Sequence, residues 1–254
     1  MIASLPMYDW PELREATDAW WGGIARHLGV AVGLDRGPDY TGVWLRPDLL
    51  FSQTCGYPFT HKLRGKVRLV ATPHYDASGC DGPNYCSIIF AREARPLADF
   101  RGRRAAVNHD DSMSGMLALK LVFASLAEHG RFFGSAFDSG GHIASLNAVR
   151  DGRADVCAVD AVCVALAGRY RPDYLEGLVE IARSPMVPGL PYVTVAGDIT
   201  KLRVGLAAAF ADPTLNEARD RLLLTGHSVL DVKNYDRIVE LETAMEKAGG
   251  LALL

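Results

Sequence analysis

Short apolar runs alternate with amphipathic helical stretches along the whole chain, and this alternation is the strongest constraint on its fold. The apolar runs at residues 48–52, 67–72 and 85–91 are too short for core helices and are typical of buried strands. Residues 13–28 instead repeat apolar side chains every three or four positions, which predicts a helix. Strands that alternate with helices pack in layers, so the sequence predicts an α/β fold.

The same patterns predict the remaining elements. Asp9 can cap the first helix, with Pro11 in its first turn and Glu12 completing a capping box. The proline-rich residues 183–191 cannot continue a helix or lie in a central strand, so they predict a stiff crossing between two lobes. Residues 137–141 are expected to form a loop. Further strands are expected at residues 2–7, 105–108, 155–160, 178–181 and 192–196, and further helices at residues 142–150, 161–167, 200–210, 214–224 and 234–248.

The charge of the chain argues against nucleic acid as a partner. Its 27 Lys and Arg residues are outnumbered by 30 Asp and Glu residues, whereas a surface that follows phosphates needs an excess of cations. The chain has no apolar stretch of about 18 residues, so no membrane span is expected. Residues 1–9 lack the basic and long apolar regions of a signal peptide, which predicts either a removed signal or a cytoplasmic protein.

The 5 cysteines do not predict a metal or redox site. Their odd number does not suit a complete disulfide framework, and no CxxC pair is present. Free buried thiols are expected, with a Cys80–Cys86 disulfide as the alternative. The sequence also lacks a P-loop, a GxSxG turn and an HExxH helix, so we expect no cofactor and no metal.

The run at residues 111–115 is the strongest candidate for a binding site, because it follows a predicted strand and opens a predicted helix. Such a helix start offers unpaired backbone N–H groups and the positive end of the helix dipole, which suit an anion. Ser112 and Ser114 add hydroxyl donors, and Gly115 permits close approach. The alternative is an ordinary N-cap serine followed by an exposed serine.

His142 opens the next predicted helix, directly after a loop that contains two glycines. A histidine there can donate to an anionic oxygen or change its charge near neutral pH. If it meets the anion in its charged form, affinity should fall as the pH rises past about 7. The alternative is a histidine that only caps the helix or faces solvent.

Five further residues are weaker candidates for the same site. Thr54 and Tyr57 follow the carboxyl end of a buried strand, which is the usual ligand side of an open α/β sheet. Tyr85 can supply a second phenol, and Tyr8 ends the first strand. Asp160 ends a short strand and can bind a cationic group of the ligand. The tyrosines can equally serve packing, and Asp160 can equally cap the following helix.

The order of these segments resembles the phosphate, phosphite and phosphonate substrate-binding proteins of ABC transporters. The resemblance covers nearly the whole chain and rests most on residues 111–115 and on Gly141 with His142. Residues 2–9, 48–52, 56–57, 85–91, 152–160 and 188–191 also carry it.

The resemblance implies a periplasmic-binding-protein-like class II fold, with two α/β lobes joined by two crossing strands. One lobe would hold residues 1–89 plus 188–254, and the other would hold residues 90–187. The ligand cleft would lie between the lobes, with hinges near residues 88–92 and 183–191.

The resemblance also implies roles for particular residues. The serine-rich helix start and the following histidine hold the phosphonate oxygens in this family, and tyrosines of the other lobe complete the site. The matching positions are Ser112, Ser114 and His142, then Tyr57 and Tyr85.

Two positions depart from the family pattern. Met113 stands where the family has a middle hydroxyl residue, which removes one donor. Asp160 is the only acidic residue that matches the pair expected to bind the amino group of an aminophosphonate.

The sequence therefore predicts a solute-binding protein that captures a small oxyanion for ABC transport, and not an enzyme. Its expected partners are a small anionic ligand and an ABC permease, and the resemblance places it in the periplasm. One alternative is a binding or sensor protein for another metabolite, such as a sulfonate or a thiamine precursor. Another is an enzyme on the same scaffold with Cys55 or His142 as a catalytic residue.

Overall fold

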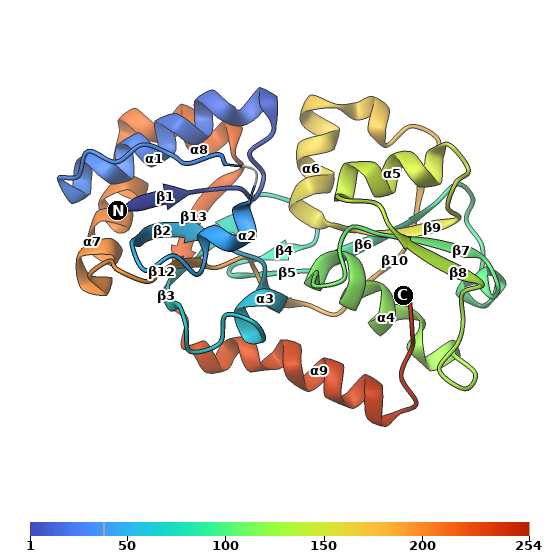
Figure 1. The fold of residues 1–254 in the computed structure, drawn as a ribbon. Helices are drawn as coiled ribbons and strands as arrows, with labels where there is room; N and C mark the ends of the chain where they lie inside the picture. The colour runs from blue at the N-terminus through green and yellow to red at the C-terminus, as the bar shows by residue number, and fades with distance from the viewer. Residues whose placement is uncertain (38, 254) are drawn as a thin grey trace. The chain divides into compact units, whose positions relative to one another are not determined.

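A computed structural model describes residues 1–37 and 39–253 of the chain (Figure 1). Its internal contacts divide the chain into two compact units. Unit 1 comprises Met1–Asp76, Asp81–Pro83 and Pro188–Tyr235, and unit 2 comprises Ala77–Cys80, Asn84–Val187 and Asp236–Leu254. Both units combine helices with a sheet, as the alternating sequence pattern predicts.

Unit 1 contains a five-stranded sheet in the order β1-β2-β12-β3-β13. Strand β1 runs parallel to β2, whereas β12 is antiparallel to both β2 and β3. All five residues of β2 are buried, and the strand begins with the apolar run Leu49–Phe51, as expected for a strand covered on both faces. The strands are β1 (Ile2–Ser4), β2 (Leu49–Gln53), β12 (Tyr192–Thr194), β3 (Arg68–Tyr75) and β13 (Leu224–Ser228).

Helix α1 (Arg14–Leu28) packs against α7 (Ile199–Ala211) and α8 (Asn216–Arg221). Its buried face carries Trp20, whose ring meets Phe210 edge to face at 4.7 Å. The expected capping box before this helix is wrong: the 3-10 turn η1 (Pro11–Leu13) begins after Trp10 without a side-chain cap. Asp9 instead accepts a 2.6 Å hydrogen bond from the guanidinium of Arg36. The shorter helices of unit 1 are α2 (Tyr40–Val43), α3 (Gly56–Thr60), η6 (Pro213–Leu215) and η7 (Val232–Tyr235).

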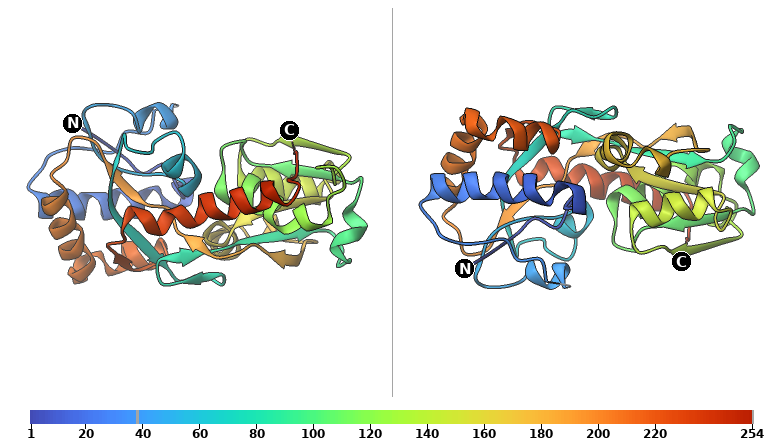
Figure 2. Two further views of the ribbon diagram at one scale, coloured as in Figure 1. Left: turned by 90° about the horizontal axis from the view of Figure 1, so that it is seen from below. Right: turned by 90° about the horizontal axis from the view of Figure 1, so that it is seen from above.

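Unit 2 contains a second five-stranded sheet, in the order β10-β6-β9-β7-β8. Strand β7 runs parallel to both of its neighbours, β9 and β8, whereas β6 is antiparallel to β9. Figures 1 and 2 show α5 and α6 on one face of this sheet and α4 on the other. The strands are β10 (Val179–Arg183), β6 (Ser87–Ala91), β9 (Val156–Asp160), β7 (Arg104–Val107) and β8 (Ser135–Asp138).

The helices of unit 2 follow its parallel strands. A π-helical turn, η3 (Met113–Leu117), continues directly into α4 (Ala118–Phe123) and η4 (Ala124–Leu126). The remaining helices are α5 (His142–Arg150), α6 (Ala161–Tyr170), α9 (Asp236–Lys247), η2 (Leu97–Phe100) and η5 (Pro172–Tyr174). A small third sheet has the order β11-β5-β4, with β11 (Val187–Pro188), β5 (Asn84–Tyr85) and β4 (Cys80–Asp81).

Two segments belong to a different unit from the one that the sequence suggests. The sequence places residues 84–89 and 236–254 in the first lobe, whereas the structure groups them with unit 2. Strand β6 pairs with β9 along its whole length, and α9 packs against α4. Both contacts join segments that are far apart in the chain, so local patterns do not reveal them.

Two expected elements differ from the structure. The predicted helix at residues 214–224 ends early, and β13 follows it with a register shift between Leu224 and Gly226. The sequence of β13 contains a glycine and polar residues, so this strand lacks the β-branched pattern that is typical of strands. The expected loop at residues 137–141 begins inside β8, whose partly exposed residues hid the strand.

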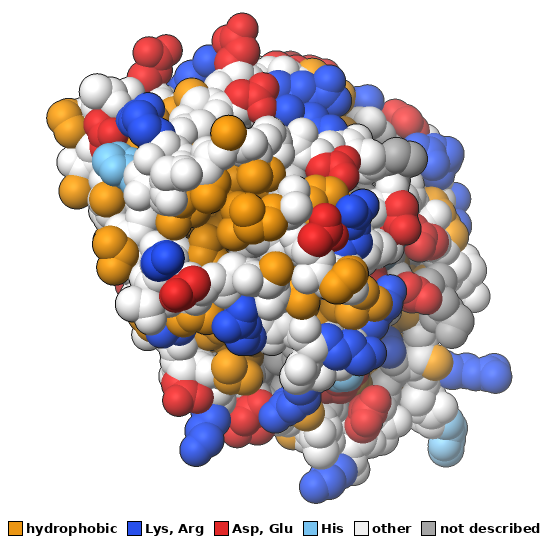
Figure 3. Space-filling model, turned by 60° about the vertical axis from the view of Figure 1, so that its left-hand side comes forward, with side chains coloured by type: hydrophobic (Ala, Val, Ile, Leu, Met, Phe, Trp, Pro, Cys, Tyr) orange, Lys and Arg blue, Asp and Glu red, His pale blue; other side chains and the backbone are white. Residues whose placement is uncertain are grey.

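The structure shows the state of the cysteines and how charged side chains are distributed on one face. All 5 cysteines are free, so the Cys80–Cys86 disulfide is absent. In the described part of the chain, no helix combines the length and hydropathy needed to cross a membrane, and no cluster of metal-ligating side chains occurs. On the face drawn in Figure 3, Lys and Arg side chains are interspersed with Asp and Glu rather than gathered into a basic surface.

Tyr235 offers a test of the packing of unit 1. Its ring is fully buried, and its hydroxyl donates to the carbonyl of Gly189 at 2.8 Å and lies 2.8 Å from Thr72 Oγ1. We expect Tyr235→Phe to lower the free energy of unfolding by about 1–2 kcal/mol, because the buried carbonyl loses its donor. Urea denaturation measures the change, and an unaltered midpoint would contradict it.

Candidate functional site

Three helices of unit 2 begin at the same edge of its sheet. Strands β7, β8 and β9 are parallel neighbours, and η3, α5 and α6 follow their carboxyl ends. The helical segment after β7, which continues into α4, covers one face of the sheet, whereas α5 and α6, which follow the neighbouring strands β8 and β9, cover the other (Figure 1). This arrangement is a topological switch point, where open α/β sheets bind their ligands.

The first of these helix starts is capped by Ser112. Its Oγ accepts a 3.0 Å hydrogen bond from the backbone N–H of Gly115, so Ser112 is the N-cap residue. The Leu117 N–H donates to the Ser112 carbonyl at 3.0 Å, one residue beyond the α-helical partner, which makes this turn π-helical. Met113 is 1% exposed and lies in the core of unit 2, so its side chain does not project into open space.

Ser114 and His142 come together from the first and second helix starts. Ser114 Oγ lies 2.8 Å from His142 Nε2, and the serine is 3% exposed. This contact joins residues 28 positions apart in the chain. The alternative of an exposed second serine is therefore wrong, because the hydroxyl is buried and bonded to the imidazole.

His142 is neutral near neutral pH. Its pKa is lowered to about 4, mainly by burial; the backbone carbonyl of Ala158 opposes this change, and His109 adds a smaller lowering. His142 Nδ1 is buried, and within the described part of the chain it has no partner in hydrogen-bond geometry. The expectation that His142 meets an anion in its charged form does not hold for the free protein.

The lowered pKa of His142 predicts a loss of stability in mild acid. The unfolded chain binds a proton on this residue below about pH 6.5, whereas the folded chain resists it down to about 4. Stability should therefore fall between pH 7 and 5, by about 2 kcal/mol from this residue. A His142→Gln variant should lose less stability over that interval when both proteins are unfolded in urea. Equal losses would show that the imidazole does not couple to folding.

Asp160 caps the third helix start. It is 1% exposed, and its Oδ1 accepts hydrogen bonds from the N–H groups of Val162 at 2.7 Å and Cys163 at 3.2 Å. The capping interpretation is thus confirmed. Burial raises the pKa of the neighbouring Cys163 thiol, and the Asp160 carboxylate raises it further.

Tyr85 lies in β5 and is 3% exposed. It belongs to unit 2, together with the serines, and not to the other lobe as the sequence suggests. Of the two tyrosines that the family resemblance implies for the other lobe, Tyr57 is thus the one that lies in unit 1.

The other candidates lie in unit 1, where β1 and β2 end. Thr54 is fully buried, and its N–H donates to the carbonyl of Pro191. Tyr57 lies in α3 and stacks on His61 with ring centroids 4.0 Å apart. Tyr8 has a φ of 64°, which is uncommon for a residue with a side chain, and its ring meets Tyr75 edge to face. All three residues follow the ends of β1 and β2 along the chain.

The sequence interpretation missed Asn108 and His109, which follow β7 directly. Asn108 is 8% exposed, and its Oδ1 is buried without a hydrogen-bond partner. His109 Nδ1 lies 3.5 Å from Asp138 Oδ2 at the end of β8. Their position immediately after a predicted strand and before the serine run is the signal that could have identified them.

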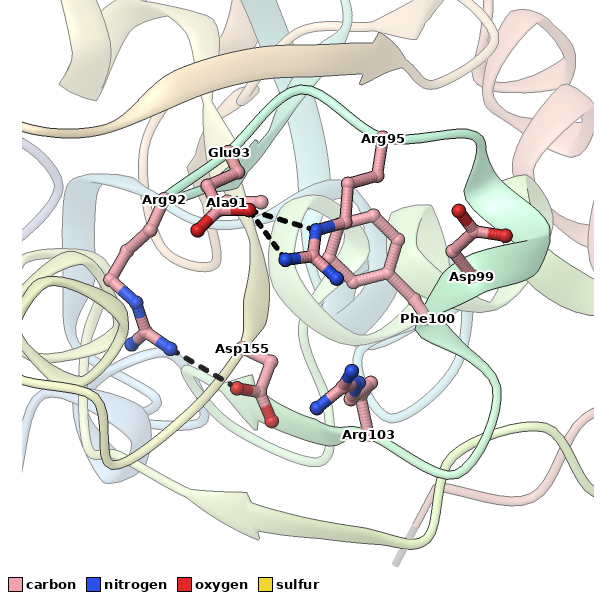
Figure 4. Close-up of a pocket in the computed structure, with 8 residues that line it drawn as sticks. All are labelled: Ala91, Arg92, Glu93, Arg95, Asp99, Phe100, Arg103 and Asp155. Atoms are coloured by element: carbon pink, nitrogen blue, oxygen red, sulfur yellow. Dashed lines mark hydrogen bonds and ion pairs between the residues drawn. The ribbon is translucent and has the colours of Figure 1, made fainter.

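A pocket of unit 2 lies at the opposite edge of the same sheet (Figure 4). It is bordered by Ala91 at the end of β6 and by Asp155, which precedes β9. Arg92 pairs with Asp155 at 3.3 Å, and another arginine pairs with Glu93. Ion pairs between the lining residues thus neutralise much of its charge, and the pocket is remote from the three helix starts.

The family described as ABC transporter, phosphonate, periplasmic substrate-binding protein has a model that matches residues 2–244. The chain belongs to this family. It is a solute-binding protein of the phosphonate type, and this family consists of transport proteins rather than enzymes. No curated protein sequence matches the chain.

Solved structures of phosphonate-type binding proteins share the fold. The binding protein component PA3383 of an ABC phosphonate transporter from Pseudomonas aeruginosa has a TM-score of 0.80 at 18% identity, over 98% of this chain and 87% of that one. PhnD1 from Prochlorococcus marinus, in complex with methylphosphonate, has a TM-score of 0.77 at 15% identity, over 97% and 98%. XAC2383 from Xanthomonas citri, bound to ATP, has a TM-score of 0.71 at 18% identity, over 97% of each chain. The periplasmic-binding-protein fold expected from the sequence is confirmed.

Proposed function

We propose that the protein binds phosphate, phosphite or a phosphonate at the three helix starts of unit 2. The partly buried Ser114–His142 pair carries this proposal, because it brings two hydrogen-bonding side chains to an edge where three helices begin. The proposal includes the two-lobed division and the ligand cleft expected from the family resemblance. Tyr8, Thr54, Tyr57 and Tyr85 are then the candidates for further contacts.

The chemistry of this edge suits an oxyanion held without bond making. Backbone N–H groups of a first helical turn have no intrahelical acceptors, and the helix dipole favours negative charge there. Ser112 uses its oxygen as an acceptor from Gly115, so its hydroxyl proton can still be donated. Neutral His142 can donate one N–H without a counter-charge. These donors would replace the hydration shell of the anion, as in other charge-assisted hydrogen bonds.

A thermal-shift screen followed by calorimetry tests the proposal. Suitable ligands are phosphate, phosphite, methylphosphonate, aminoethylphosphonate, sulfonates, thiamine precursors and, in view of the Xanthomonas citri structure, ATP. A ligand at about 100 times its Kd stabilises the native state by roughly 2.7 kcal/mol, so a phosphorus oxyanion should raise Tm clearly. Stabilisation by a sulfonate or a thiamine precursor alone would favour the alternative ligand classes.

Ser114→Ala should weaken binding of the phosphorus oxyanion by about 1–2 kcal/mol, or roughly 5- to 30-fold, because one hydroxyl donor is lost. Ser184→Ala is the matched control. Ser184 is also buried in unit 2, but its hydroxyl accepts a hydrogen bond from the N–H of Ser87, the first residue of β6. The control should keep the affinity of the unaltered protein. Equal affinities of all three proteins in calorimetry would remove Ser114 from the site.

We also propose an ABC permease as the protein partner and the periplasm as the compartment. Both follow from the family description rather than from a surface of this chain. Fractionation of cells that produce the protein from its own gene would test the compartment.

A further inference from the structure

Asn108 occupies the middle of the edge where the three helices begin. It follows Val107, the last residue of β7, and β7 lies between β9 and β8. The carbonyl of Val107 accepts hydrogen bonds from the backbone N–H and the hydroxyl of Ser139, which follows β8. These bonds fix the backbone directly before Asn108.

The amide of Asn108 lies against Gly115, next to the buried Ser114. A Cβ atom on Gly115 would overlap Asn108 Oδ1 and lie 2.6 Å from its Cγ. A carbonyl oxygen is attracted weakly to a Cα–H group, whereas an amide N–H at this place would oppose it. The contact with Gly115 therefore favours the orientation in which Oδ1 lies toward Gly115 and the NH₂ group is directed away from it.

This arrangement leaves the amide oxygen of Asn108 buried and unsatisfied. Asn108 is 8% exposed, and among the described residues its Oδ1 has no hydrogen-bond partner. A buried polar group without a partner costs about 1–3 kcal/mol, so such groups are rare in native structures and call for a specific cause. An apolar residue would fill this position at lower cost if only packing were required.

We propose that Asn108 is a specificity-determining residue of the oxyanion site, and that its NH₂ group donates to a ligand oxygen. This inference rests on the proposed function. The amide would supply two directed donors without a positive charge, beside those of Ser114 and the helix start. The ligand would therefore have to present an unprotonated oxygen as the acceptor at this point.

The test compares Asn108→Asp and Asn108→Ala with the unaltered protein, with methylphosphonate and inorganic phosphate as the probes. At pH 7.5 we expect Asn108→Ala to raise Kd about 10-fold and Asn108→Asp to raise it at least 100-fold, because the aspartate removes both donors and repels the anion. Asn147→Asp is the matched control, since its Oδ1 is also buried without a partner, but within α5. It should leave Kd within about twofold.

A pH series separates ligand contact from mere packing. A protonated aspartic acid regains one donor, so the affinity deficit of Asn108→Asp relative to the unaltered protein should shrink as the pH falls from 7.5 to 4.5. A lowered Tm with unchanged Kd in both Asn108 variants would overturn the inference and leave the proposed function intact. Failure of the unaltered protein to bind either probe would overturn both.

Discussion

Gly115→Ala should destabilise the protein by about 3 kcal/mol and abolish measurable binding of a phosphorus oxyanion. The new methyl group would overlap Asn108 Oδ1 and lie 3.3 Å from the Asn108 backbone nitrogen. Because Asn108 is buried, its short side chain has little space into which it can rotate. Urea denaturation and calorimetry with methylphosphonate measure the two losses.

Two variants show whether this loss arises from the contact with Asn108. In Gly22→Ala the added methyl meets nothing within 4 Å, so this exposed helical substitution should stabilise the protein by up to about 1 kcal/mol. The double variant Asn108→Ala/Gly115→Ala should be more stable than Gly115→Ala alone, because the overlap with the amide is removed. Additive losses in this cycle would show that the two residues are not coupled.

Much of the fold could be predicted because most elements have a clear local pattern. The helix expected at residues 142–150 is α5 with the same bounds, since a glycine pair precedes it and Gly152 follows it. The buried strands β2 and β9 were recognisable from the short apolar runs with which they begin. The strand β13 was not, because its residues gain their extended form from pairing with β3 rather than from their own preference.

The candidate site shows the same division between local and long-range information. Ser112 as an N-cap follows from the serine run alone, and the structure bears this out. The meeting of Ser114 with His142 depends on the strand order of the unit 2 sheet, which no local pattern reveals. The burial that keeps His142 neutral depends on the same packing, so its charge could not be predicted from its place in the sequence.

Asp160→Ala should lower the free energy of unfolding by about 2–4 kcal/mol. The buried carboxylate is the cap of α6, and its loss leaves the N–H groups of Val162 and Cys163 without their acceptor. Asp160→Asn is the matched control, because an asparagine oxygen can accept the same two hydrogen bonds and caps helices about as well. Chemical denaturation should therefore give a higher free energy of unfolding for Asp160→Asn than for Asp160→Ala.

The same pair of variants decides between a cap and a ligand contact for this residue. If Asp160 serves only α6, Asp160→Asn should keep the ratio of the affinities for aminoethylphosphonate and methylphosphonate, since both carboxylate and amide retain the capping oxygen. If the charge of Asp160 faces the amino group of a ligand, the substitution should weaken aminoethylphosphonate about 10-fold or more while methylphosphonate is unaffected or gains. Because both hydrogen bonds to Oδ1 come from the first turn of α6, we expect the unchanged ratio, and calorimetry with the two phosphonates on one preparation measures it.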